Sequence, residues 1–324
     1  AAAAQKFDLT EAQLEETLAV SRRLLSAARA QRPPPGRDDK IVTAWNGLMI
    51  SAYARAAQAL DDPGYGDAAT RAAAFVRRNL YREEAGTLRR SCRAGASKVD
   101  GFADDYAFLI QGLLDLYETT FDARWIEWAL KLQARQDDLF WDDQGGGYFT
   151  TTRRAPDILL RSKAAYDGAE PSPNSVAALN LLRLSQMLDR QDWRERAERT
   201  LRAFGPQLEQ APSALPQMLV ALDWLSAPPK QIVIVGRIAE SDTRALLRAV
   251  QAPFIPNKIL LLADGEGGPK SLAAHNAFLG GVKMIDGKAT AYVCENYVCR
   301  LPATDPGELA KLFDKREEGT ACPP

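Results

Sequence analysis

Apolar residues recur along most of the chain at the spacing of an α-helix. Segments near residues 45–60, 104–120 and 174–188 are apolar on a broad face or almost all round, which predicts three enclosed helices. Each is followed by a short turn and a more polar helix, and these partner helices begin at Tyr65, Trp125 and Trp193. This order predicts helical hairpins with inner and outer helices in two concentric layers, and a further inner helix at 216–225. An irregular helical bundle is the alternative.

The pattern differs at both ends of the chain. A helix is expected from Leu9 to Arg29, with Thr10 and Gln13 as a capping box. After Pro228-Pro229, short β-branched runs at 231–236, 258–263 and 290–295 predict strands, with helices at 242–250 and 305–313 and Thr304 as an N-cap. We therefore expect a helical domain at 1–227 and a small α/β domain with a mainly parallel sheet at 228–324.

The charge balance excludes several classes of protein. With 41 basic and 42 acidic residues the net charge is -1, which does not favour nucleic acid or an anionic membrane as a partner. No apolar run reaches the roughly 20 residues that span a bilayer. No signal peptide follows Ala1, so we expect a cytoplasmic location, and because the sequence starts without Met we expect a start internal to a longer protein. Four cysteines are too few for a disulfide framework and are expected to be reduced.

Polar clusters occupy one repeat position, just before each inner helix. The clusters are Asp38-Asp39-Lys40 leading to Trp45-Asn46, then 100–106, then 167–174. If the hairpins form a ring, all three loops emerge at the end where the N-termini of the inner helices gather. Aromatic faces stack on sugar rings, while carboxylates and amides bind hydroxyls, so the pattern predicts a carbohydrate pocket. Each residue taken singly is equally compatible with an ordinary helix cap.

The candidate residues divide into two groups. Asp104 and Asp105 point about 100° apart on a helix, so we expect Asp105 to face the pocket and Asp104 to cap the helix. Crowded carboxylates should raise the pKa of at least one of them. The predicted catalytic residues are Asp105, Asp104 and Asp39, and the predicted substrate-binding residues are Trp45, Asn46, Tyr106, Asp167, Glu170 and Asn174.

No cofactor or metal is expected. The sequence GGGYF at 145–149 lacks the lysine and hydroxyl residue of a phosphate-binding loop. Cys294 and Cys299 lie five residues apart, which on one continuous strand places them on opposite faces. Their spacing does not favour zinc. His275 is the only histidine and lies outside the helical part.

Several stretches resemble the spermatogenesis-associated protein 20 family, also known as the YyaL-type thioredoxin-domain proteins. They are DDKIVTAWNGLMISAYARAA at 38–57, GFADDYAFLIQGLLDLYETTFD at 101–122 and DGAEPSPNSVAALNLLRL at 167–184. The resemblance implies an (α/α)6 toroid of six hairpins, similar to six-hairpin glycosidases and N-acylglucosamine 2-epimerase, and it implies a preceding thioredoxin-like domain. This chain then holds an incomplete toroid. The first hairpins are expected from the remainder of the protein or from a partner chain.

Two functional hypotheses follow. In the first, the pocket belongs to a carbohydrate-active enzyme, a hydrolase or an isomerase/epimerase. The epimerase relatives use histidines as acid and base, and the helical part of this chain has none, so the carboxylates are the candidates. In the second, the region is a non-catalytic binding or scaffold part of a thioredoxin-domain protein, and its acidic residues serve as caps and salt bridges.

Overall fold

The structure is a computed structural model that describes residues 1–93, 95, 99–153, 158–227, 229–263, 276–295 and 298–314. The chain divides into two compact units, Ala1–Lys40 and Ile41–Pro324. The first unit contains α1 (Ala2–Lys6) and α2 (Glu11–Ala30). The capping box of α2 is confirmed, because Thr10 Oγ1 accepts from the Gln13 N–H at 3.2 Å and Gln13 Oε1 accepts from the Thr10 N–H at 3.0 Å.

Helical hairpins make up most of the second unit, as the periodicity predicts. The three hairpins are α3 (Thr43–Leu60) with α4 (Pro63–Asn79), α5 (Ala103–Thr120) with α6 (Ala123–Phe140), and α7 (Pro173–Leu188) with α8 (Gln191–Ala203). They are followed by α9 (Gly205–Gln210), the 3-10 helix η1 (Pro212–Ala214) and α10 (Pro216–Ser226). The first helix of each of the three hairpins ends on a left-handed residue with φ of 52° to 56°, namely Asp61, Phe121 and Asp189. This repeated cap ends the helix and reverses the chain.

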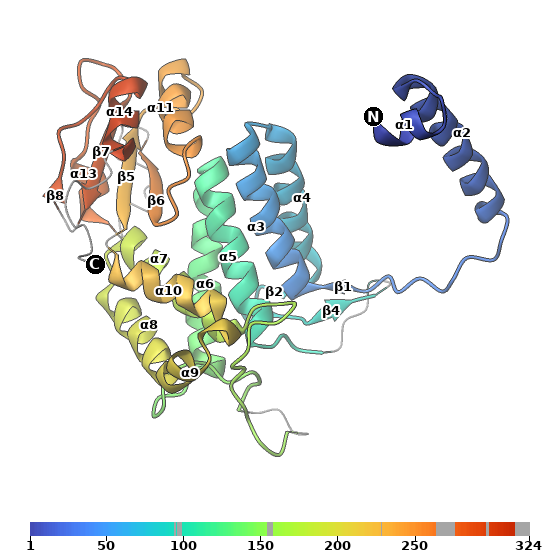
Figure 1. Cartoon of the computed structure of the whole chain (residues 1–324). Coiled ribbons are helices and arrows are strands. Elements are labelled where there is room, and N and C mark those ends of the chain that lie inside the picture. Colours follow the sequence, from blue (N-terminus) through green and yellow to red (C-terminus); the bar gives the residue numbers. More distant parts are fainter. Residues whose placement is uncertain are drawn as a thin grey trace, which may run out of the picture. The chain divides into compact units, whose positions relative to one another are not determined.

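The helices form two layers, seen side by side in Figure 1. Helices α3, α5, α7 and α10 pack in a row, and α4, α6 and α8 cover their own inner partners. Helices α5 and α7 are buried on almost every side, whereas α3 exposes Trp45, Met49 and Leu60. This arrangement is part of an α/α toroid. The expectation that further hairpins flank this array stays a prediction.

The backbones of α3 and α5 touch at two glycines. A Cβ atom on Gly47 would lie 2.5 Å from the Leu109 nitrogen, and one on Gly112 would lie 2.6 Å from the Gly47 carbonyl oxygen. Distances this short exclude any side chain at either position. The two glycines therefore set the separation of the first two inner helices.

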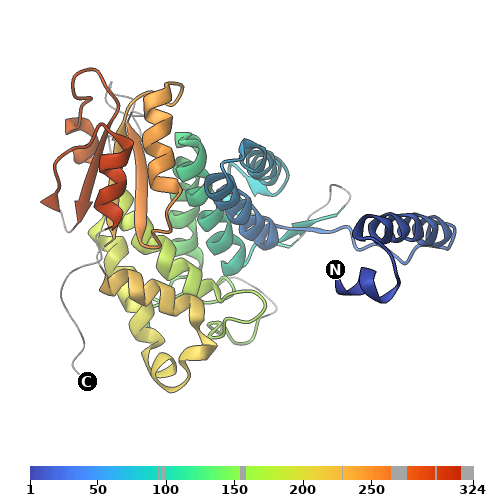
Figure 2. The same cartoon turned by 45° about the horizontal axis from the view of Figure 1, so that its top comes forward.

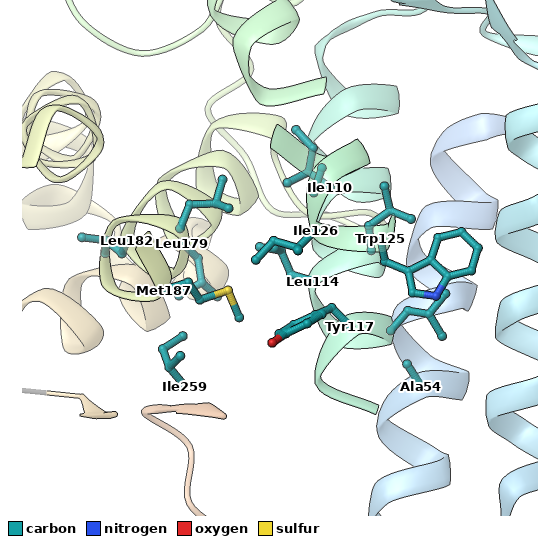
Figure 3. Packing of buried hydrophobic residues seen from close by; sticks show 14 of the residues in the cluster. Ala54, Ile110, Leu114, Tyr117, Trp125, Ile126, Leu179, Leu182, Met187 and Ile259 are labelled. Atoms are coloured by element: carbon teal, nitrogen blue, oxygen red, sulfur yellow. The ribbon is translucent and has the colours of Figure 1, made fainter. Parts of the chain in front are cut away.

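The main core lies between α5 and α7 and continues into the sheet. Ile110, Leu114 and Tyr117 of α5 face Leu179 and Met187 of α7, with Ile259 beside them (Figure 3). Because Ile259 belongs to β6 (Lys258–Ala263), the helical array and the sheet share one apolar core. The predicted domain boundary at 227–228 stays a prediction.

Strand order corrects the predicted sheet. The strands β5 (Lys230–Val235), β6, β7 (Thr290–Glu295) and β8 (Val298–Cys299) follow the order β6-β5-β7-β8. Only β5 and β6 are parallel, and the other two pairings are antiparallel, so the prediction of a mainly parallel sheet is wrong. The chain runs through α11 (Ser241–Gln251) between β5 and β6, a helical crossover, whereas β7 and β8 form a hairpin.

Two further corrections concern this α/β part. The β7–β8 hairpin makes Cys294 and Cys299 cross-strand partners, and they form a disulfide instead of the expected reduced thiols on opposite faces. Helix α14 (Pro306–Asp314) is capped by Asp305, which accepts from the Glu308 N–H at 2.9 Å, and not by Thr304. Helices α11 and α14 pack against each other beside the sheet (Figure 2), and α13 (Ala277–Gly281) precedes β7.

Two short antiparallel strand pairs lie beside the first two helical hairpins. Strand β1 (Ile41–Val42) pairs with β4 (Ser91–Cys92), and β2 (Tyr81–Arg82) pairs with β3 (Thr87–Leu88). The Thr43 N–H donates to the Arg90 carbonyl at 2.9 Å, which holds this connection against the start of α3. The loop therefore delivers Arg90 to the N-terminal end of the inner helices.

Candidate functional site

Asp105 joins the N-terminal ends of α3 and α5. Its Oδ1 accepts from the Ala44 N–H at 2.9 Å, and its Oδ2 accepts from the Phe102 N–H at 2.8 Å and from Arg90 Nη1 at 3.1 Å. The side chain has no exposed surface. It satisfies backbone donors that the first turn of each helix leaves without an intrahelical partner.

Asp104, the residue expected to cap α5, is the more exposed of the two neighbouring carboxylates. Its Oδ2 pairs with Arg90 Nη1 at 2.5 Å, and its side chain is 17% exposed. Its Oδ1 has no hydrogen-bond partner within the described residues. The expected division of roles is therefore wrong, because a residue at the third helical position reaches back to the N-cap amide, and Asp105 holds that position.

The two carboxyl groups are electrostatically coupled. Burial raises the pKa of Asp105 to about 7, and the charge of Asp104 acts in the same direction. The Arg90 guanidinium and the Phe102 N–H oppose this shift without cancelling it. As expected from the sequence, one carboxyl of the cluster holds a proton close to neutral pH.

Trp45 and Glu170 connect the loops before α3 and α7. The indole Nε1 of Trp45 donates to Glu170 Oε1, and the Trp45 residue is 52% exposed. Its neighbour Asn46 is half-buried and donates to the Val42 carbonyl at 2.8 Å, one turn back along its own helix. The hydrogen bond to Glu170 therefore orients an aromatic ring whose surface is open to solvent.

Tyr106 and Asn174 support the structure around this surface. The Tyr106 hydroxyl accepts from the Leu88 N–H at 3.0 Å, and burial raises the pKa of Tyr106 to about 12. Asn174 accepts from the Tyr148 N–H at 2.6 Å and donates to the Tyr148 carbonyl at 3.0 Å. Both side chains are buried, and their part in substrate binding stays a prediction.

Asp167 has a similar supporting role. It accepts from the backbone N–H groups of Ser172 at 2.6 Å, Gln217 at 2.8 Å and Met218 at 3.3 Å. These bonds fasten the loop before α7 to the first turn of α10. Asp39 belongs to the Ala1–Lys40 unit, and its membership of the site stays a prediction.

The loops before α3, α5 and α7 thus meet at one end of the array. The structure joins Trp45 to Glu170, and it joins Asp104 and Asp105 to Arg90, which the sequence reasoning missed. Arg90 lies in a connection between hairpins, and no local pattern distinguishes it from neighbouring arginines. We call Trp45, Arg90, Asp104 and Glu170 the Trp45 surface.

The sequence reasoning also missed a charged network midway along the inner helices. Asp115 and Glu118 both pair with Arg183, at 2.8 Å and 2.9 Å, and Arg55 pairs with Asp115 at 3.0 Å. These residues line a cavity of about 680 Å3. Charged residues within the apolar runs of α5 and α7 were the available signal, since buried charges require partners.

The fold defines a class, that of α/α toroid proteins. Sequence comparison then identifies the relatives. The chain is 44% identical over 299 residues to human spermatogenesis-associated protein 20, covering 89% of this chain and 38% of that protein. An uncharacterised protein of Caenorhabditis elegans is 35% identical over 325 residues, covering 96% of this chain and 43% of that protein. The chain therefore belongs to the spermatogenesis-associated protein 20 family, as its sequence motifs indicate.

The chain spans about two-fifths of the length of these curated relatives. No model of a known protein family matches it. Within the described residues, no helix is sufficiently long and apolar to cross a bilayer. His275 lies outside the described residues.

Two solved structures illustrate more distant likenesses. The α-mannanase BT2949 of Bacteroides thetaiotaomicron has a TM-score of 0.43 and 16% identity, covering 54% of this chain and 45% of that one. Cellobiose 2-epimerase of Spirochaeta thermophila has a TM-score of 0.42 and 18% identity, and the match covers 51% of this chain and 43% of that one. Likenesses of this degree do not define an activity.

Proposed function

We propose that the Trp45 surface binds a carbohydrate. The observation that carries this proposal is a half-exposed Trp45 ring oriented by Glu170 at the end of the array where Arg90 and Asp104 also lie. An aromatic face offers apolar contact to one side of a pyranose ring. The carboxylates and the guanidinium offer the acceptors and donors that ring hydroxyls require.

We further propose that Asp104 and Asp105 act as one acid–base pair in a sugar-directed reaction of the hydrolase or isomerase/epimerase type. A carboxyl whose pKa is about 7 holds and releases a proton at neutral pH, which general acid–base catalysis needs. Asp104 is the member with exposed surface, so it is the one that would contact a ligand. We propose Asp39 as a further catalytic carboxylate.

A non-catalytic binding or scaffold function is the second candidate. One observation favours it, namely that Asp105 has no exposed surface and accepts two backbone N–H bonds and one from Arg90. A carboxylate held in this way stabilises helix ends whether or not it performs chemistry. Binding is common to both candidates, so it is the property to test first.

Replacing Trp45 by alanine should weaken carbohydrate binding by about five- to tenfold, because loss of a stacked aromatic face removes on the order of 1–1.5 kcal/mol. The measurement is ligand-observed NMR titration of the 324-residue chain with mono- and disaccharides. Met49→Ala is the matched control, since Met49 is 54% exposed on the same helix and has no aromatic face. If the wild type and Trp45→Ala bound the saccharides equally well, the Trp45 surface would not be the carbohydrate site.

A further inference from the structure

A second cavity-lining region has chemistry of its own. The cavity of about 680 Å3 lies among α3, α5, α7, α10 and the segment 254–258 that leads into β6. Its volume is typical of small-molecule sites. None of the residues of the Trp45 surface lines it, so it is a separate site that we call the inner cavity.

Three acidic residues line the inner cavity, and one of them, Asp223, accepts from Asn257 Nδ2 at 2.8 Å. Asp115 accepts from Ser51 at 2.5 Å and also from Arg55 and Arg183. Glu118 accepts from Arg183 Nη2 at 2.9 Å and from the Leu260 N–H at 3.2 Å. Each of the three carboxylates therefore already accepts at least one hydrogen bond.

Some hydrogen-bond donors on residues that line the inner cavity, in contrast, have no acceptor within the described residues. Arg183 Nη1 and Trp224 Nε1 are buried and have no hydrogen-bond partner within the described residues. No salt bridge involves Lys258 in the described part of the chain, and burial lowers the pKa of its ammonium group. Arg55 keeps its side chain 60% exposed beyond its pairing with Asp115. Buried donors without acceptors cost free energy that an entering acceptor would recover.

Part of the lining of the inner cavity is apolar. It is formed by Leu219 and Val220 of α10 and by Phe254 and Ile255 of the segment before β6. Val220 and Phe254 expose 45% and 92% of their surface. An occupant that complements both the donor groups and the apolar residues of the lining carries an oxyanion at one end and an apolar body at the other.

We propose that the inner cavity binds a small carboxylate with an apolar body. The carboxylate lies toward Lys258 and Arg55, where charge-assisted hydrogen bonds form, and the apolar body lies against Val220 and Phe254. Binding offsets the burial of the Lys258 ammonium group. The proposal does not depend on the Trp45 surface, so either one can fail without the other.

Benzoate is the probe, and isothermal titration calorimetry of the 324-residue chain at constant ionic strength is the measurement. Benzoate should bind at least about tenfold more tightly than benzyl alcohol, which has the same ring without the charge. Lys258→Met should weaken benzoate binding by about tenfold. Lys131→Met is the matched control, since Lys131 is an exposed lysine of α6 outside the cavity, and it should leave binding unchanged.

Val220→Asp keeps the test decisive if Lys258→Met does not fold. Val220 is partly exposed, so an aspartate there should leave the fold intact while its charge repels benzoate and weakens binding by about tenfold. Absence of saturable benzoate binding would overturn the proposal. Unchanged binding in both variants, or inorganic phosphate binding as tightly as benzoate, would overturn the assignment of the ligand class.

Discussion

Replacing Gly47 by alanine is expected to lower the free energy of unfolding by about 2–4 kcal/mol, the range of severe overpacking. The added methyl group would lie 2.5 Å from the Leu109 nitrogen and 2.5 Å from the Phe108 carbonyl carbon. Both are backbone atoms of α5, so the two helices must separate and the core behind them must repack. Urea unfolding followed by circular dichroism measures the change.

Gly205→Ala is the matched control. No atom lies within 4 Å of a Cβ at that position, so the variant should unfold within about 1 kcal/mol of wild type. Gly112→Ala should lower the free energy of unfolding as Gly47→Ala does. The double variant should lose less stability than the sum of the two single losses, because both substitutions act on one contact. Wild-type stability in Gly47→Ala would show that α3 and α5 are not in backbone contact.

The free energy of unfolding of the wild type, minus that of Asp105→Asn, is expected to fall by roughly 1–3 kcal/mol as the pH rises from 5 to 8. The pKa of Asp105 is about 7 in the folded chain and roughly 3.9 in an unfolded one. The folded state therefore holds the proton more tightly. The resulting stabilisation is fully present below roughly pH 4 and is lost as the pH rises through about 7. The asparagine side chain keeps the shape of the aspartate and cannot titrate, so urea unfolding of both proteins across this range isolates the group.

Asp104→Asn is the companion variant. The charge of Asp104 raises the pKa of Asp105, so its removal should move the pH-dependent loss of stability to lower pH. A difference between wild type and Asp105→Asn that stays constant or grows with pH would exclude a raised pKa. It would also remove the basis for proposing acid–base chemistry at this pair.

The hairpins could be predicted from the sequence because their signals are local. Apolar spacing marks the enclosed faces of α5 and α7, and the capping box marks the start of α2. The family resemblance added the toroid class. The shared repeat position of the polar loops also placed Trp45, Asp104, Asp105 and Glu170 at one end of the array, because helices that run side by side bring equivalent ends together.

Contacts between distant residues were decided only by the tertiary structure. Which of two adjacent aspartates turns inward depended on the Ala44 and Phe102 amides and on Arg90, and Asn174 proved to bind the backbone of Tyr148. The Cys294–Cys299 disulfide and the antiparallel pairing of β7 with β5 depended on which strands become neighbours in the sheet. A sequence pattern reports the preference of each segment by itself, whereas the partner of a buried polar group is set by whichever donor or acceptor the packed fold brings within about 3 Å.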